Sequence, residues 1–188
     1  MTGAAGVLGS DLSRTLETMS FEVLRTDINS EKGVRYLDVR DSSGVLALVR
    51  REPPDLVIHL AAETDVDRCQ IEANHAYQTN TLGTWNVALA CRQEDIPMVY
   101  VSTAGVFDGS KPEPYIEFDN TNPINVYGRT KLEGERIVRH LLSRFFIVRA
   151  AWMIGGGPSK DKKFVAKIMK QLEAGARELR AVTDKVGS

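Results

Sequence analysis

The chain has 188 residues, of which 43% are hydrophobic and 26% are charged, so it can bury a core and is not a disordered tail. Its 24 Lys and Arg residues balance 25 Asp and Glu residues, which excludes a general electrostatic attraction to nucleic acid or to an anionic membrane. No apolar run approaches the roughly 20 residues that span a bilayer, and the cysteines and histidines lack metal-ligand spacing. We therefore expect a cytoplasmic protein that binds no metal, nucleic acid or membrane.

Helical and extended patterns alternate along the chain. Because strands that alternate with helices are joined by parallel crossovers, this order predicts an α/β fold with a doubly wound, Rossmann-like parallel sheet. We expect the strands at 55–60, 97–102 and 145–150 to be buried on both faces, since each is a short apolar run. The predicted helices are 7–19, 42–51, 80–93, 125–142 and 164–175, and the other strands are 21–27 and 34–39.

Three glycines stand at intervals of three before the first predicted helix, at Gly3, Gly6 and Gly9. Glycine permits a tight turn and lets backbone N–H groups approach a pyrophosphate at the helix N-terminus. Asp27 ends the next strand, 18 residues after the last glycine, where an acid meets the adenosine ribose. Asp38 ends the following strand and is a candidate for the adenine edge. The alternative is a glycine-rich loop with a tight helix contact, but the two acids favour dinucleotide binding.

Tyr127 and Lys131 lie four residues apart on one predicted helix and therefore share a face. An ammonium beside a phenol lowers the pKa of tyrosine from its usual value of about 10, which suits acid–base catalysis. Such pairs are also common on surface helices. Here the helix follows a strand that ends at Thr103, and ligands of such sheets bind at the carboxyl ends of the strands. The context predicts a site in which the Thr103 hydroxyl binds a substrate carbonyl or alkoxide.

Together, the motifs at 2–9, 59–62, 80–84 and 101–103 and the pair Tyr127 and Lys131 resemble the extended short-chain dehydrogenase/reductases. Within that superfamily, the stretches 106–109, 127–135, 148–152 and 184–188 are most similar to the dTDP-4-dehydrorhamnose reductases. The resemblance implies an NAD(P)H-dependent reductase of a nucleotide-linked 4-keto sugar.

The resemblance also implies a role for individual residues. Thr103 would bind the reacting oxygen, Tyr127 would donate the proton, and Lys131 would hold the nicotinamide ribose. Thr64 and Trp152 would line the sugar pocket together with Thr103. With Asp27 included from its position, the cofactor-binding residues would be Gly3, Gly6, Val7, Leu8, Gly9, Asp27, Asp38, Val39, Leu60, Ala61, Ala62, Tyr127 and Lys131.

Residues 1–150 would form the NAD(P)-binding domain with the catalytic triad, and 151–188 would begin a substrate-binding region that is largely missing. Only Met1 and Thr2 precede the glycine turn, and no closing element follows the last strand pattern. We therefore expect the natural protein to be longer at both ends. Asp27 predicts a preference for NAD(H), with NADP(H) still usable. The expected partners are the nucleotide sugar and a second copy in a homodimer.

One departure from the reductase pattern leaves alternatives open. Ala104 and Gly105 stand where these reductases usually carry Asp and Tyr, which leaves the sugar undefined and weighs against a 4,6-dehydratase. A nucleotide-sugar epimerase with bound NAD is one alternative. A regulatory subunit similar to the β subunit of methionine adenosyltransferase is another. We further expect His59 to be a hydrogen-bonded core residue, Asn80 to cap a helix, and Trp85 to pack between helices.

Overall fold

The computed structural model describes residues 1–155 and 164–179. It contains two short parallel ladders, β1 with β2 and β3-β4-β5 in that order. Thr2 joins them, because it bridges Thr26 on one side and His59 on the other, both in the parallel sense. The spatial order is therefore β2, β1, Thr2, β3, β4, β5. The strands are β1 (Thr26–Asp27), β2 (Arg35–Tyr36), β3 (Val57–His59), β4 (Met98–Thr103) and β5 (Phe145–Ala150).

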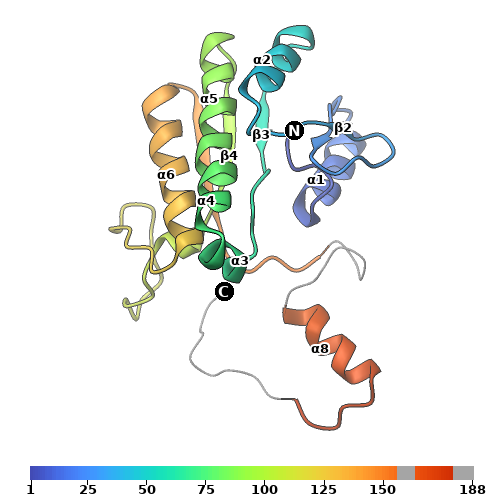
Figure 1. Cartoon of the computed structure of the whole chain (residues 1–188), viewed down its shortest axis with the longest axis vertical. Helices are drawn as coiled ribbons and strands as arrows, with labels where there is room; N and C mark the ends of the chain where they lie inside the picture. Colours follow the sequence, from blue (N-terminus) through green and yellow to red (C-terminus); the bar gives the residue numbers. More distant parts are fainter. Residues whose placement is uncertain (156–163, 180–188) are drawn as a thin grey trace.

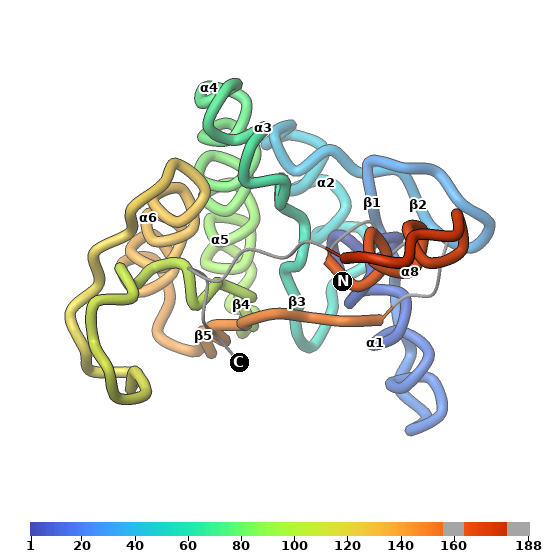
Figure 2. The backbone as a smooth tube through the Cα atoms, turned by 90° about the horizontal axis from the view of Figure 1, so that it is seen from below, coloured from blue at the N-terminus to red at the C-terminus, as the bar shows by residue number. Residues whose placement is uncertain are grey.

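Helices cover the strands from both sides. Figure 2 shows α2, α5 and α6 on one side of β3, β4 and β5, and α1 on the other. In Figure 1 the helices α2, α5 and α6 stand in a row, and α5 contacts both of its neighbours. This arrangement confirms the predicted doubly wound α/β fold. The helices are α1 (Val7–Thr18), α2 (Ser42–Arg51), α3 (Val66–Ile71), α4 (Ala73–Ala76), α5 (Gly83–Gln93), α6 (Val126–Leu141) and α8 (Phe164–Glu173).

Local signals in the sequence set several helix ends. The Asp41 side chain caps α2 by accepting from the backbone N–H groups of Ser43 and Gly44. Asn125 caps α6 in the same way, because its Oδ1 accepts from Gly128 N at 2.8 Å. The predicted helix 80–93 is wrong at its start. A π-helix, Tyr77–Leu82, precedes α5 and is continuous with α4.

The main core lies between the sheet and the row of α2, α5 and α6. It is built from small and β-branched residues, which let the helices pack close to the strands. Its buried members are Val39, Val45, Val49, Val57, Val87, Ala88, Ala90, Cys91, Ile96, Met98, Tyr100, Val138, Leu141 and Leu142.

Three strand predictions differ from the structure. The predicted strand 34–39 is reduced to the two residues of β2. The predicted strand 21–27 pairs only at its end, where Thr26 N donates to the Met1 carbonyl and Thr26 and Asp27 pair with β2. The expectation that β5 is buried on both faces is wrong. Phe146 is 74% exposed and Val148 is 48% exposed, since α6 covers only the opposite face of this strand among the described residues.

Candidate active site

The glycine turn packs directly on the end of β3. Gly3 has φ of +68°, and a Cβ at this position would lie 2.6 Å from the backbone nitrogen of Ala61. A Cβ at Gly9 would overlap the carbonyl oxygen of Gly3, so the turn and the first turn of α1 also need glycine to approach each other. Gly6 is the N-cap of α1, and Val7 opens the helix. The structure thus brings the predicted pyrophosphate residues together at the carboxyl ends of the central strands.

Asp27 lies at the edge of this turn. Its Oδ2 accepts from Ala5 N at 3.0 Å, and its Oδ1 accepts from Asn29 N at 2.8 Å. The side chain is buried at the end of β1. The carboxylate therefore stands beside the glycine turn, where the sequence analysis placed the ribose, and it also fixes the turn to β1.

Asp38 and Val39 follow β2 and differ in their surroundings. Arg40 binds Asp38 with two nitrogens, Nε at 2.9 Å and Nη2 at 2.6 Å, and this guanidinium holds the pKa of Asp38 below its usual range. The side chain of Val39 is in the core, and its carbonyl accepts from Asn86 Nδ2 at 2.9 Å. Only the backbone of Val39 is left to contact a nucleotide. The Arg40 pairing was not foreseen, although an Asp and an Arg two residues apart were visible in the sequence.

Thr103 and Tyr127 meet where α6 begins against the end of β4. Thr103 is the last residue of β4, and its Oγ1 accepts from Gly105 N at 3.0 Å. Tyr127 is the second residue of α6, and Gly128 after it lies directly on the Gly105 carbonyl, with no room for a Cβ. Burial raises the pKa of the Tyr127 phenol above its usual value, and the hydrogen bond with the Thr103 hydroxyl acts in the opposite direction. The expectation of a lowered pKa is therefore wrong, because the loss of solvent outweighs the favourable contacts.

Lys131 is buried one turn after Tyr127, with 2% of its surface exposed. Its Nζ lies 4.3 Å from the centroid of the Tyr100 ring, a cation–π contact on β4. Burial lowers the pKa of Lys131 to about 7, while Glu135 acts to raise it. The Tyr100 hydroxyl donates to the Lys131 carbonyl at 3.3 Å, and Gly134 leaves the space for this hydroxyl.

A buried polar chain runs behind these residues from the central strand to α5. His59 Nδ1 lies 2.7 Å from Thr2 Oγ1, and His59 Nε2 lies 3.1 Å from Thr84 Oγ1. Burial lowers the pKa of His59 to about 3, so the imidazole is neutral at ordinary pH. The prediction of a hydrogen-bonded core histidine is confirmed.

Asn80 has a different role from the predicted helix cap. It lies inside the π-helix, and its Nδ2 donates to the Glu63 carbonyl and to Thr130 Oγ1, both at 3.0 Å. Thr130 Oγ1 in turn donates to the Tyr127 carbonyl at 2.8 Å. Asn80 therefore connects the segment after β3 with the first turn of α6. Short π-helical segments within α-helices are rare, and they are frequently found at functional sites.

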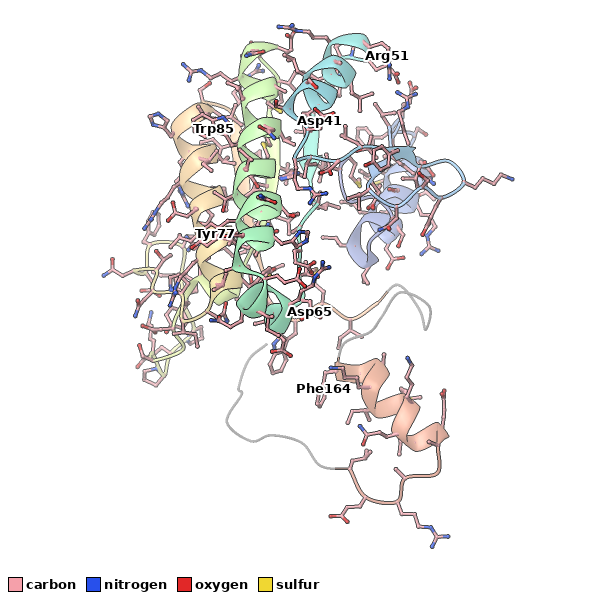
Figure 3. The ribbon with its side chains drawn as sticks, in the orientation of Figure 1. Asp41, Arg51, Asp65, Tyr77, Trp85 and Phe164 are labelled. Carbon is pink, nitrogen blue, oxygen red and sulfur yellow. The ribbon has the colours of Figure 1, made fainter. Side chains whose placement is uncertain are left out.

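The remaining predicted residues lie at the same end of the sheet. Ala62 and Thr64 are in the segment between β3 and α3, and Thr64 is exposed next to Asp65, which caps α3 and is labelled in Figure 3. Trp152 follows β5 and is 65% exposed.

Trp85, labelled on α5 in Figure 3, was expected to pack between helices, but it is 40% exposed. Its indole borders a surface groove with Tyr77, Leu82 and Ile137.

A buried ionic cluster beside Lys131 was missed by the sequence analysis. Glu135 of α6, Ser102 of β4 and Arg149 of β5 form it. The signals were present: an acid four residues after Lys131 on the same helix face, and an arginine within an apolar strand.

Two other features bear on the kind of site. Within residues 1–155 and 164–179, no three His, Cys, Asp or Glu side chains gather as a metal ion would require. In the same part of the chain, no helix combines the length and the apolar character needed to cross a bilayer.

All 188 residues match one protein family, described as the RmlD substrate binding domain. The chain belongs to this family. Among curated relatives, the spore coat polysaccharide biosynthesis protein SpsK of Bacillus subtilis (strain 168) is 34% identical over 188 residues. The dTDP-4-dehydrorhamnose reductase of Mycolicibacterium smegmatis is 35% identical over 189 residues. Both alignments cover 100% of this chain but only 63% and 54% of these two proteins, so the chain spans less than two thirds of their length.

Solved structures agree with the family. The dTDP-4-dehydrorhamnose reductase of Clostridium acetobutylicum superposes with a TM-score of 0.88 at 39% identity, over 99% of this chain and 62% of that one. The reductase of Bacillus anthracis, in complex with NADP, gives a TM-score of 0.80 at 36% identity, over 92% and 58%. The UDP-glucose 4-epimerase of Brucella ovis, in complex with NAD, gives 0.73 at 25% identity, over 79% and 50%. These likenesses confirm the resemblance and the Rossmann-like fold that the sequence motifs predicted.

Proposed function

We propose that the protein is a reductase of a nucleotide-linked 4-keto sugar that uses a reduced nicotinamide dinucleotide. The observation that carries this proposal is the meeting of Thr103 and Tyr127 at the carboxyl end of β4, one helical turn from the buried Lys131. Relatives that match the full chain are named reductases of such a sugar. Residues 1–150 would bind the dinucleotide, and 151–188 would begin the sugar-binding region.

The glycine turn fits a dinucleotide. Backbone atoms leave no room for a side chain at Gly3 or Gly9, so the turn presents only backbone there. It lies at the N-terminus of α1, where backbone N–H groups favour a pyrophosphate. Asp27 would accept the ribose hydroxyls, and Asp38 with the backbone of Val39 would border the adenine. NADP-bound and NAD-bound neighbours support both cofactors. The full set of cofactor-binding residues would comprise Gly3, Gly6, Val7, Leu8, Gly9, Asp27, Asp38, Val39, Leu60, Ala61, Ala62, Tyr127 and Lys131.

When it is bound, the nicotinamide supplies the hydride. The side chains of this chain would bind the sugar and supply the proton. The Thr103 hydroxyl would donate a hydrogen bond to the carbonyl oxygen, which stabilises charge on that oxygen as it develops. Tyr127 would transfer its phenolic proton to the same oxygen, and its raised pKa keeps that proton in place at neutral pH. Lys131 would hold the nicotinamide ribose, and Thr64 and Trp152 would line the sugar pocket.

An epimerase is the second candidate, because the Brucella ovis epimerase superposes with NAD bound. An epimerase removes and returns the hydride at one carbon and therefore shows no net consumption of the cofactor. The greater identity to the reductases, 39% against 25%, favours net reduction.

The test is a stoichiometric assay on the whole protein with dTDP-4-dehydrorhamnose and NADH or NADPH. We expect one reduced cofactor to be oxidised per sugar reduced, which is followed by the loss of nicotinamide absorbance and by analysis of the sugar. Turnover of sugar without net oxidation of cofactor would establish the epimerase instead. Binding of cofactor with no turnover, together with a stoichiometric protein partner, would favour the regulatory subunit.

A further inference from the structure

Glu135 is the centre of an ionic cluster inside the protein. Its side chain is 1% exposed, and its Oε1 accepts from Ser102 Oγ at 2.7 Å. Arg149 binds both carboxylate oxygens, with Nε 2.9 Å from Oε1 and Nη2 2.8 Å from Oε2. Arg139, which is half exposed, adds a longer contact of 3.4 Å. Burying a carboxylate is costly, and here the bidentate guanidinium and a hydroxyl offset that cost.

The cluster joins three elements directly behind the candidate active site. Ser102 precedes Thr103 on β4, and it lies opposite Arg149 in the register of β4 with β5. Glu135 lies one turn after Lys131 on α6. Ser102 is therefore one strand position and Glu135 one helical turn from a residue that the proposed reaction uses, and Arg149 binds Glu135 from the neighbouring strand.

Arg149 also reaches the long loop between β4 and α6. Its guanidinium lies 5.0 Å from the centroid of the Phe107 ring, and its Nη1 donates to the Glu117 carbonyl at 3.4 Å. Phe107 stacks on Tyr115 at 4.2 Å. One partly buried side chain thus contacts the helix that carries Tyr127 and the loop that precedes this helix.

Two close contacts of α6 with the sheet side of the protein are made by glycines. Gly128 lies on the Gly105 carbonyl just after β4, and Gly134 lies on the Tyr100 ring of β4, so neither offers a side chain to interdigitate with the sheet. A bidentate ion pair has a defined geometry, which apolar contacts lack. Buried polar groups are known to select one arrangement of packed elements in some proteins.

We propose that Glu135 and Arg149 are positioning residues, which hold α6 and the loop after Phe107 in the one register that places Tyr127 and Lys131 against Thr103. This inference deepens the proposed function and rests on it for the roles of the three catalytic side chains. Neither Glu135 nor Arg149 touches the reacting atoms.

The charge of Glu135 has a second consequence, because it acts on Lys131. The groups that act on the Lys131 ammonium among the described residues are the Tyr100 ring from β4, the neutral His59 from β3, and Glu135 from α6 itself. Glu135 is the one of these that carries a negative charge at neutral pH. Removing the Glu135 charge is therefore expected to make Lys131 lose its proton at a lower pH. A residue that only held α6 in place would not have this effect.

The experiment compares Glu135→Gln and Arg149→Lys with two controls in the whole protein. Glu135→Gln removes the charge and keeps an oxygen for Ser102. Arg149→Lys keeps the charge and loses the bidentate geometry. The controls are Glu133→Gln and Arg136→Lys on the exposed side of α6, where these two residues pair only with each other among the described contacts. The measurements are kcat and KM for the keto sugar, Tm, and the titration of Lys131 by NMR of lysine labelled with ¹³C at Cε.

We expect kcat to fall by about tenfold to a hundredfold in Glu135→Gln and in Arg149→Lys, since small displacements of reacting groups cost this much. KM for the sugar should stay within about threefold. In Glu135→Gln the Lys131 titration should move to lower pH, whereas Arg149→Lys should leave it near the wild-type value. Both controls should match wild type. If Glu135→Gln does not fold, Ser102→Ala removes one contact of the same carboxylate and should lower kcat by a smaller factor.

Lower Tm with unchanged kcat and an unchanged Lys131 titration would overturn the proposal and leave an ordinary structural ion pair. Failure of the proposed function has a different signature: wild-type protein that turns over no 4-keto sugar with either cofactor. In that case the Lys131 titrations of wild type and Glu135→Gln still decide whether Glu135 acts on the lysine.

Discussion

Gly128 of α6 lies against the carbonyl oxygen of Gly105, so closely that a Cβ at position 128 would overlap this oxygen. This backbone contact joins the residue after Tyr127 to the turn that follows Thr103. It therefore sets the separation between the phenol and the hydroxyl, which come from different elements.

Replacing Gly128 with Ala tests this contact. In an exposed helix the change would stabilise by about 1 kcal/mol, but here we expect a net loss of roughly 1 to 3 kcal/mol because backbone must move. Urea denaturation measures the loss, and kcat should fall with it. Arg129→Ala is the control, since Arg129 is exposed on the same turn. A Gly128→Ala protein as stable and active as the control would mean that the contact is loose.

Tyr127→Phe removes the phenolic hydroxyl and keeps the ring. We expect cofactor affinity to stay within about threefold and kcat to fall by about 10² to 10⁴, the usual contribution of a general acid. Fluorescence titration with NADPH and steady-state kinetics provide the two values. Tyr36→Phe serves as the control, because Tyr36 is exposed on β2. Wild-type turnover in Tyr127→Phe would remove this residue from the mechanism.

Elements with local signals could be predicted from the sequence. Helix α2 begins and ends at the predicted residues, because Asp41 caps it and two prolines follow it. The helix carrying Tyr127 was placed within one residue at each end for the same reason: Asn125 is its cap. The glycine turn was recognised because its spacing is local.

Features that depend on distant contacts could not be predicted. Thr2 pairs with strands on both sides, which only the assembled sheet reveals. The raised pKa of Tyr127 follows from burial, which spacing along a helix does not report. The bond from Asn80 to Thr130 spans 50 residues, so a helix cap was the simpler prediction. The Glu135–Arg149 pair likewise joins elements whose proximity is a tertiary property.

We expect the cofactor preference to depend on the carboxylate of Asp27. Its oxygens accept from Ala5 and Asn29 beside the glycine turn, and if the ribose binds there, as proposed, the carboxylate would repel a 2′-phosphate. Arg25, directly before β1, is paired with Glu17 and would therefore offset this charge little. We expect NADH to bind about tenfold more tightly than NADPH, which is about 1.4 kcal/mol.

Asp27→Asn removes the negative charge and should therefore abolish most of that preference. The amide oxygen can still accept from Ala5, so the glycine turn should keep its contact with β1. Dissociation constants of both reduced cofactors at one ionic strength measure the ratio. Asp55→Asn, at an exposed acid before β3, is the control. Tighter binding of NADPH by wild type would show that Asp27 does not contact the ribose.

The free energy of unfolding should depend on pH, because Lys131 titrates at a different pH in the folded protein than in the unfolded chain. Its pKa is about 7 in the folded protein and about 10.4 in the unfolded chain, so between these values the unfolded state binds more protons. The free energy of unfolding therefore rises with pH through this window and is independent of this group below it. Relative to Lys131→Met, wild type should gain about 1 to 2 kcal/mol from pH 7 to pH 8.5. Urea denaturation at the two pH values measures the gain, and Lys167→Met, at an exposed site on α8, is the control and should follow wild type. Parallel pH dependences for wild type and Lys131→Met would show that Lys131 keeps its ordinary pKa when buried.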